Sequence, residues 1–309
     1  MILNTGSRTD IPAFFSEWLV NRLKEGYVLV RNPYNPSQLI RYEIDPTVVD
    51  LISFCTKNPE PMLKHLSLLE PFHQLWQVTL TPYGKDIEPN VPDKHEVIKT
   101  VQELSKQVGK KAVIWRYDPI FLSDRYSMDY HFRAFSAIAS SLNGYTEKVV
   151  ISFLDLYEKT KRNFPEGKEV SWEDQIRITK QLVKTAAENG MKVYTCHEKK
   201  ELGQYGADTS GCMSQAIVEE AIGFRLDVPR LSNAREGCSC LLGSDIGAYN
   251  TCMHFCRYCY ANYDRETVLK NMKKHDPGSP LLIGNVLPED HVVNARQKSW
   301  KSVLIQLDI

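Results

Sequence analysis

The feature that most constrains the fold of this 309-residue chain is a short apolar segment, rich in β-forming residues, that recurs seven times and is usually followed by a helical pattern. Short buried strands that alternate with helices predict a parallel sheet, and seven such units predict an α/β fold of the (β/α), TIM-like barrel type. We expect helices over 13–25, 94–108, 129–142, 173–189 and 214–222. The predicted strands are 2–6, 27–30, 51–55, 75–80, 112–116, 149–153 and 191–196.

Polar and charged side chains gather where these predicted strands end. In a (β/α) barrel the carboxyl ends of the strands converge on one mouth, which carries the active site. We therefore expect a lined pocket there, although any one of these residues could equally cap a helix or pair with a neighbour. Three cations at the mouth favour an anionic substrate group, so Arg31, Lys57, Arg116 and Asp118 are our candidates for catalysis. The strand-end residues are Arg8, Asp10, Arg31, Asn32, Lys57, Asn58, Arg116, Asp118, Asp155 and Glu198.

Five of the eight cysteines lie in one block near the C-terminus. Within it, Cys252, Cys256 and Cys259 have the spacing C-x3-C-x2-C, which lets one tight loop place three thiolates around a corner of a [4Fe–4S] cubane. The fourth iron then has no protein ligand and is open to a small molecule, as in catalytic metal sites. Burial of unligated thiols is one alternative, and a zinc knuckle completed by Cys238 and Cys240 is another.

The remaining cysteines predict a second metal site. Cys196 ends a predicted strand, Cys212 follows it, and Cys238 and Cys240 lead into the loop. Four thiolates suit an auxiliary iron–sulfur cluster or a zinc ion equally well. The alternative is ordinary burial of small apolar thiols, which is what we expect for Cys55 in the middle of a strand.

The loop CMHFCRYCYAN resembles the CxxxCxΦC loop of radical S-adenosylmethionine (radical SAM) enzymes, and its CYCY ending resembles the loop of spore photoproduct lyase. The chain as a whole is more closely similar to the bacterial family DUF1848, whose C-terminal cysteines resemble the radical SAM cluster loop. The stretches that carry this resemblance run over essentially the whole sequence: SRTDIPAFF, VRNPYNPSQ, TKNPEPM, TLTPYG, WRYDPI, YTEKVVISFLD, DIGAYNTC, CRYCYAN and DPGSPLLIGN.

The resemblance to radical SAM enzymes implies a [4Fe–4S] cluster that gives one electron to S-adenosylmethionine, producing a 5′-deoxyadenosyl radical that abstracts hydrogen from a substrate. It implies that Tyr258, the aromatic residue before the third cysteine, lies near the adenine. Radical SAM loops usually follow the first strand, so a loop after the last strand predicts a permuted barrel. Arg8 and Asp10, at the end of the first strand, would then replace the missing GGE motif, with Asp10 holding the amino group of S-adenosylmethionine.

We expect the barrel to span 1–230 and a cysteine-rich, cluster-binding segment to span 231–309 and pack on the barrel mouth within a single structural domain. Lys plus Arg number 38, as do Asp plus Glu, so no net charge attracts nucleic acid or anionic lipid. The N-terminus has no secretory signal, and no apolar run reaches the roughly 20 residues that span a bilayer. These features predict a cytoplasmic protein that acts on a small molecule, away from membranes and nucleic acid.

A radical SAM enzyme also implies an electron donor, such as a ferredoxin or flavodoxin. Three other functions remain open from the sequence. One is a non-SAM iron–sulfur protein, acting as an electron carrier or as a Lewis-acid hydro-lyase. The second is DNA repair like that of photoproduct lyase, which the neutral charge disfavours. The third is a structural zinc protein.

Overall fold

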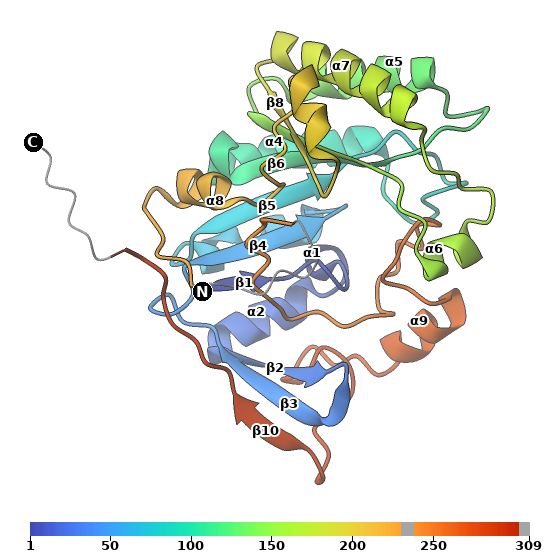
Figure 1. Ribbon diagram of the computed structural model, residues 1–309. Helices are drawn as coiled ribbons and strands as arrows, with labels where there is room; N and C mark the ends of the chain where they lie inside the picture. Colours follow the sequence, from blue (N-terminus) through green and yellow to red (C-terminus); the bar gives the residue numbers. More distant parts are fainter. Residues whose placement is uncertain (230–237, 303–309) are drawn as a thin grey trace, which may run out of the picture.

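The computed structural model describes residues 1–229 and 238–302, and it has the α/β fold that the sequence predicts. Its main element is a parallel sheet of seven strands in the order β8-β7-β6-β5-β4-β1-β9 (Figure 1). Helical crossovers return the chain between most of these strands, as parallel pairing requires. The strands are β1 (Ile2–Asn4), β4 (Leu51–Thr56), β5 (Gln74–Thr79), β6 (Val113–Ile120), β7 (Lys148–Phe153), β8 (Lys192–Thr195) and β9 (Ser244–Asp245).

The sheet is open within the described residues, because no ladder joins its two edge strands, β8 and β9. The closed barrel that seven repeats predict is therefore not seen in this part of the chain. β9 pairs with β1, with Leu3 opposite Ser244 and Asn4 opposite Asp245. The segment that enters the cysteine loop thus starts beside the first strand. The predicted domain boundary at 230/231 lies outside the described residues.

The predicted strand at 27–30 is not part of the parallel sheet. It lies in β2 (Tyr27–Asn32), which pairs antiparallel with β3 (Asn35–Glu43), and β10 (His291–Asn294) completes this small sheet. Only two residues connect β2 to β3, whereas a parallel neighbour needs a crossover of a dozen or more. The prediction that 27–30 is a strand of the barrel was wrong, because the chain turns back after two residues and pairs antiparallel with β3.

The helices begin and end at ordinary capping residues. Asp93 and Ser171 accept hydrogen bonds from first-turn backbone amides of α4 and α7, and Gly26 and Gly223 end α2 and α8 in the left-handed conformation. The α-helices are α1 (Ile11–Phe14), α2 (Ser16–Glu25), α3 (Glu60–Leu63), α4 (Lys94–Val108), α5 (Met128–Leu142), α6 (Glu158–Asn163), α7 (Trp172–Glu188), α8 (Gln215–Ile222) and α9 (Arg265–Met272), and short 3₁₀ turns span Leu66–Leu69, Lys110–Ala112 and Lys200–Tyr205.

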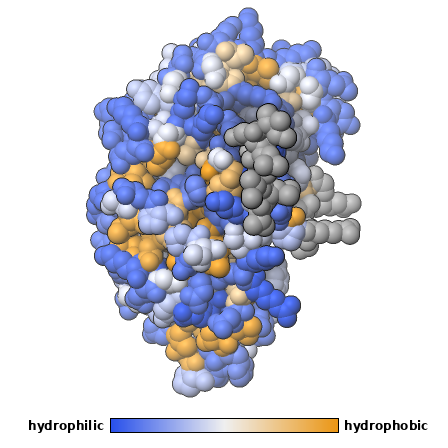
Figure 2. All heavy atoms as spheres, turned by 90° about the vertical axis from the view of Figure 1, so that its left-hand side faces the viewer, coloured by the Kyte–Doolittle hydropathy of each residue, from blue (hydrophilic) through white to orange (hydrophobic). Residues whose placement is uncertain are grey.

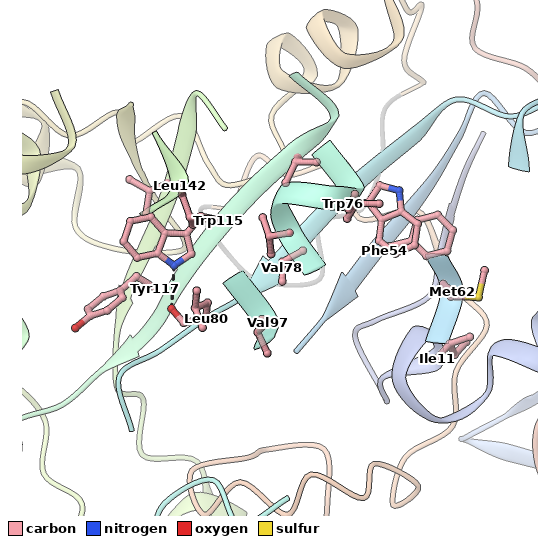
Figure 3. Close-up of a cluster of buried hydrophobic side chains, with 14 of the residues drawn as sticks. Ile11, Phe54, Met62, Trp76, Val78, Leu80, Val97, Trp115, Tyr117 and Leu142 are labelled. Atoms are coloured by element: carbon pink, nitrogen blue, oxygen red, sulfur yellow. Dashed lines mark hydrogen bonds between the residues drawn. The ribbon is translucent and has the colours of Figure 1, made fainter. Parts of the chain in front are cut away.

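The larger hydrophobic core lies between one face of the sheet and the helices α1, α2, α4, α5 and α7. Figure 3 shows part of this core. Phe54 of β4 stacks on Trp76 of β5, with ring centroids 3.9 Å apart. Trp115 of β6 packs against Phe135 of α5 and donates its Nε1–H to the carbonyl of Leu80 at 2.9 Å. Burial of such side chains contributes about 1.5–3 kcal/mol each. This packing fixes the strand ends that carry the polar residues.

The opposite face of the sheet, here called the inner face, is covered by α8 and by the segments on either side of it. Near the start of the strands this face is apolar, with Leu51 and Leu75 in contact with the covering segments. Two residues further along these strands it becomes polar, and Ser53 and Gln77 each hydrogen-bond to the sulfur of Met213 at 3.4 Å. The inner face therefore becomes more polar towards the carboxyl ends of the strands.

The surface carries a small apolar area on the second sheet. Figure 2 shows apolar atoms at the lower end of the face that it displays, level with the small sheet in Figure 1. In β10, Val292 and Val293 remain 49% and 47% exposed. Among the described residues, no helix combines the length and the apolar character that crossing a bilayer requires.

Candidate metal centre

The cysteine loop lies at the carboxyl edge of the parallel sheet, on the β1 side (Figure 1). Asp245 at the end of β9 accepts hydrogen bonds from the backbone N–H groups of Ser7 at 2.7 Å and Gly247 at 2.8 Å. Ile246 donates its backbone N–H to the carbonyl of Asn4 at 2.9 Å. These bonds attach the entrance of the loop to the end of the first strand.

The other side of the loop is held by the segment after β5 and by α6. Asn90 donates its backbone N–H to the carbonyl of His254 at 3.2 Å, and Arg257 donates its backbone N–H to Ile87 at 3.0 Å. Thr160 of α6 donates its hydroxyl to a loop carbonyl at 3.2 Å. Because these partners come from distant parts of the sequence, the position of the loop depends on the complete fold.

Of the loop thiols, Cys256 is buried and Cys252 and Cys259 are half-buried, and the three lie close enough to interact electrostatically. Burial raises the pKa of all three, Cys252, Cys256 and Cys259. Two of the sulfur atoms accept backbone hydrogen bonds: the N–H of His254 bonds to Cys252, and that of Ala261 bonds to Cys259 at 3.3 Å. N–H donors to sulfur stabilise thiolates and tune iron–sulfur clusters, so the loop suits metal-bound sulfur.

Lysine ammonium groups from three elements surround these thiols. Burial has the largest effect on the pKa of these thiols and raises it. Lys57 and Lys94 act in the opposite direction on Cys256, and Lys57 and Lys159 act in the opposite direction on Cys259. Lys57 follows β4, Lys94 begins α4 and Lys159 lies in α6. Nearby lysines favour the thiolate form, which is the form that binds metal. They would also offset the negative charge of a cluster with three thiolate ligands.

Glu88 connects the lysines to the aromatic residue of the loop. Its buried carboxylate accepts hydrogen bonds from Lys57 at 2.8 Å and Thr81 at 2.6 Å, and also from Lys94 and the hydroxyl of Tyr258. Burial alone would raise the pKa of Glu88, but the two lysines outweigh it and hold the pKa at about 2. The ammonium of Lys57 lies 5.6 Å from the centre of the Tyr258 ring. The orientation of this ring is therefore fixed by a buried ionic network.

Asp10 is the second anchor of the loop. One of its oxygens lies 2.8 Å from Nε2 of His254 and accepts the backbone N–H of Lys57 at 2.8 Å, while the other caps α1 by accepting from Ala13 at 3.1 Å. Both oxygens of Asp10 therefore have protein partners already. A contact of Asp10 with an amino group of S-adenosylmethionine would have to share or replace one of them. Arg8 lies close by and pairs with Asp245 at 3.8 Å.

Three buried polar atoms around the loop have no hydrogen-bond partner among the described residues: Oγ1 of Thr9, Nδ1 of His254 and Oδ1 of Asn262. Asn262 itself is held by a 2.7 Å bond from its Nδ2 to the carbonyl of Cys252. Leaving a polar atom buried and unpaired costs about 1–3 kcal/mol. Such atoms beside three thiols fit a site that is built to hold a further polar group.

The structure brings together three of the four predicted catalytic residues. Arg116 and Asp118 of β6 form a salt bridge, and Arg116 also donates to Gln77 at 2.6 Å. Burial raises the pKa of Asp118, but Arg116, the hydroxyl of Ser152 and the ammonium of Lys57 together lower it below its usual value. The charged groups of Lys57, Arg116 and Asp118 thus lie near one another at the carboxyl end of the inner face.

Arg31 lies outside this group, so its predicted place at the mouth was wrong. Its guanidinium pairs with Asp290 at 2.5 Å and donates to the carbonyl of Asn285 at 3.1 Å. The strand that carries Arg31 belongs to the small sheet, so its end does not reach the carboxyl edge of the parallel sheet. In the described structure, Arg31 joins this sheet to the segment before β10.

Three of the four cysteines predicted for a second metal site meet on the inner face. Sγ of Cys212 lies 3.4 Å from Sγ of Cys196 and 3.5 Å from Sγ of Cys240. Cys238 is half-buried and packs on the same apolar cluster. Within the described residues, no three His, Cys, Asp or Glu side chains already surround a common point as the ligands of one ion.

Sequence reasoning missed Glu88, Lys94 and His254. Glu88 and Lys94 lie in and just after a long polar connection that follows β5. Only residues directly after each predicted strand were taken as candidates. The rest of this connection also lies at the carboxyl edge of the sheet, so its charged residues were candidates for the same reason. His254 stands between two of the predicted ligands, and its spacing alone does not indicate that its ring turns back to Asp10.

The comparison with protein families agrees with the resemblance seen in the sequence. The chain belongs to the family described as "Domain of unknown function (DUF1848)", whose model matches residues 2–261. The matched region contains the whole parallel sheet and the three loop cysteines. No curated protein matches the chain.

Proposed function

We propose that this protein is an iron–sulfur enzyme of the radical SAM type, with a [4Fe–4S] cluster held by Cys252, Cys256 and Cys259. The observation that carries the proposal is the setting of these thiols. They lie buried or half-buried at the carboxyl edge of a parallel sheet, two of them accept backbone N–H bonds, and lysine ammonium groups lie close to them. When bound, the cluster would supply one electron for the reductive cleavage of S-adenosylmethionine.

The protein's own residues would bind, orient and enclose the reactants. Lys57 and Lys94 offset negative charge at the cluster, and Glu88 orients both lysines. The bond from the Tyr258 hydroxyl to Glu88 keeps the ring in one position, which suits an aromatic surface for adenine. Nδ1 of His254, which has no partner among the described residues, would be free to hydrogen-bond a polar group of the bound cofactor. Such fixed positions are how a protein lowers the barrier of a reaction carried out by its cofactor.

The substrate would lie on the polar part of the inner face. Arg116 and Lys57 provide positive charge there, and each is paired with a carboxylate, Asp118 and Glu88 respectively. An anionic group of a substrate would bind to the guanidinium or the ammonium by sharing it with that carboxylate. A ferredoxin or flavodoxin is the kind of partner that would supply the electron.

The test is anaerobic reconstitution with iron and sulfide, followed by reaction with dithionite and S-adenosylmethionine. We expect about four iron ions and four sulfides per chain at the loop, and slow release of 5′-deoxyadenosine. Replacing Cys252, Cys256 or Cys259 by Ala should abolish both. Cys55→Ala is the matched control, because Cys55 is a half-buried cysteine near the end of β4 and should not be needed for either.

Two results would count against the proposal in different ways. A full cluster in the wild-type protein without binding or cleavage of S-adenosylmethionine would exclude the radical SAM function. The remaining functions would then be an electron carrier or a Lewis-acid hydro-lyase. Unchanged iron and sulfide in all three loop variants would show that the loop does not bind the cluster.

A further inference from the structure

The inner face holds a group of thiols that the proposed function does not use. Cys212 belongs to the segment that covers this face, Cys196 directly follows β8, and Cys240 lies on the stretch that leads to β9. Sγ of Cys212 is 3.4 Å from Sγ of Cys196 and 3.5 Å from Sγ of Cys240. Three segments that are far apart in sequence thus contribute one sulfur atom each.

Backbone hydrogen bonds hold these three segments together. Thr195 donates its N–H to the carbonyl of Asp208 at 2.9 Å, which joins the end of β8 to the covering segment. Leu241 donates its N–H to the carbonyl of Met213 at 2.9 Å, which joins the covering segment to the stretch before β9. Because these bonds flank the cysteines, the thiols are brought together by the fold of the backbone and not by side-chain rotation alone.

Gly211 makes the close approach of two of the cysteines feasible. It adopts φ +107°, a conformation that residues with a side chain rarely adopt. A Cβ atom at this position would lie 3.0 Å from Sγ of Cys240 and 3.2 Å from Oγ of Ser239. The residue next to Cys212 therefore has no side chain at the point where Cys240 packs.

The separation of the sulfur atoms suits one metal ion. Four thiolates around a tetrahedral zinc ion, with Zn–S bonds of about 2.3 Å, lie roughly 3.8 Å from one another. The distances of 3.4 and 3.5 Å are within a few tenths of an ångström of this value. In a cubane each thiolate binds a different iron, so the sulfur atoms would be further apart. A disulfide would need about 2.05 Å.

A fourth thiol and a compensating charge are nearby. Cys238 precedes Cys240 by two residues, is half-buried and packs on the same apolar cluster as Cys212. The buried guanidinium of Arg116 lies close enough to interact with Cys196 and Cys212. A zinc ion with four thiolates carries a net charge of about −2, and a neighbouring cation reduces the cost of burying it.

We propose that Cys196, Cys212, Cys238 and Cys240 bind one Zn²⁺ ion as a closed structural site. A small rotation of the thiols would bring them around a common point, and the ion would fasten the covering segment to the β8 edge of the sheet. A closed site with four protein ligands has no position for a substrate. This inference does not depend on the proposed function, because it concerns a different set of cysteines.

The first experiment removes the loop ligands, so that only the second site can hold metal. The full-length variant in which Cys252, Cys256 and Cys259 are all replaced by Ala is purified, and its metal content is measured by mass spectrometry. We expect about one zinc per chain. Adding Cys212→Ser should remove it, whereas adding Cys55→Ser as the matched control should leave it in place. The proposal would be overturned if zinc persisted after Cys212→Ser. It would also be overturned if the variant that lacks only the three loop cysteines contained no zinc.

A second measurement does not depend on any variant folding. X-ray absorption at the zinc edge of the wild-type protein should show four sulfur neighbours at about 2.3 Å. Iron and acid-labile sulfide retained by the variant in which the three loop cysteines are replaced by Ala would point to a cluster instead and contradict a single ion. A Cys196–Cys212 disulfide found by mass spectrometry in protein alkylated at cell lysis would contradict it as well.

The role of Cys238 can be tested separately because its side chain is only half-buried. When Cys238→Ser is added to the variant that lacks the three loop cysteines, the zinc ion should have three sulfur neighbours and one lighter neighbour in place of four sulfur atoms. Four sulfur atoms in this variant would show that Cys238 is not the fourth ligand.

Discussion

The carboxylate of Asp10 lies 2.8 Å from Nε2 of His254, which joins the end of the first strand to a loop near the other end of the chain. Since a carboxylate only accepts, Nε2 donates the hydrogen of this bond. Carboxylate–histidine pairs of this kind commonly fix the ring orientation beside metal sites. The same carboxylate also caps α1 and accepts the backbone N–H of Lys57, so the side chain of Asp10 links three segments by hydrogen bonds.

Replacing Asp10 by Ala should destabilise the protein by about 2–4 kcal/mol. About 1 kcal/mol comes from the lost helix cap, and the rest from the unpaired N–H groups of Lys57 and His254. The matched control is Asp93→Ala, because Asp93 caps α4 through His95 alone and should cost only about 1 kcal/mol. Urea unfolding of both variants measures the difference, and equal losses would contradict the anchoring role of Asp10.

Replacing Glu88 by Gln should cost about 3–5 kcal/mol, because it leaves two partly buried ammonium groups without their buried carboxylate. Glu96→Gln is the comparison, since the ion pair of Glu96 with Lys99 on the surface of α4 is exposed and its loss should leave the unfolding midpoint unchanged. Thermal and urea unfolding of the metal-free protein would measure both. A Glu88→Gln midpoint equal to that of Glu96→Gln would contradict the importance of the buried network.

His131 should make the stability of the protein depend on pH between about 4 and 6.5. Its ring is buried, accepts the Tyr117 hydroxyl at Nδ1 at 2.8 Å and donates to the carbonyl of Phe121 at 2.9 Å. Burial lowers the pKa of His131 from 6.5 to about 4. Between these values the unfolded chain binds more protons, so the stabilisation is complete above pH 6.5 and is lost as the pH falls towards 4.

The predicted loss from His131 is about 3 kcal/mol over this range. His131→Gln should be less stable at neutral pH but should show a smaller pH slope than the wild type. His95→Gln serves as the control, because His95 is exposed on α4 and its replacement should leave the slope unchanged. Free energies of unfolding at a series of pH values would decide, and an unchanged slope in His131→Gln would refute the assignment.

Gly211→Ala should be more destabilising than Gly144→Ala. Both glycines have positive φ, at +107° and +85°, so both replacements strain the backbone. A Cβ atom at Gly144 meets no atom within 4 Å, whereas one at Gly211 lies 3.0 Å from Sγ of Cys240. Overpacking of this kind adds about 1–3 kcal/mol. Similar unfolding free energies for the two variants would show that the cysteine group tolerates the displacement.

The parallel sheet could be predicted from the sequence because each of its longer strands is a compact apolar run with a polar end. The α4 helix was predicted with its observed bounds, because Asp93 and Gly109 give clear start and stop signals. The strand at 27–30 was assigned to the wrong sheet, since its apolar pattern does not say which partner it pairs with. β9 has only two residues, too few to show any periodicity.

The candidate site was predictable to a similar degree. The spacing of Cys252, Cys256 and Cys259 identifies a loop from local sequence alone, and strand ends indicated Lys57, Arg116 and Asp118. The buried partners were not predictable in the same way, because Glu88 meets Tyr258 only once the sheet has formed. The grouping of Cys196, Cys212 and Cys240 followed from counting cysteines, whereas their contact depends on how the chain crosses the inner face.

The pairing of β1 with β9 has a consequence for how the protein is made. β1 leaves the ribosome long before its neighbour on one side, β9, which ends at Asp245. At synthesis rates of about 5–20 residues per second, that edge of β1 waits on the order of 10–50 s for its partner. The cysteine loop comes later still. A nascent chain can therefore build most of the sheet while still lacking the loop, so the three loop cysteines become available only after their surroundings have begun to fold.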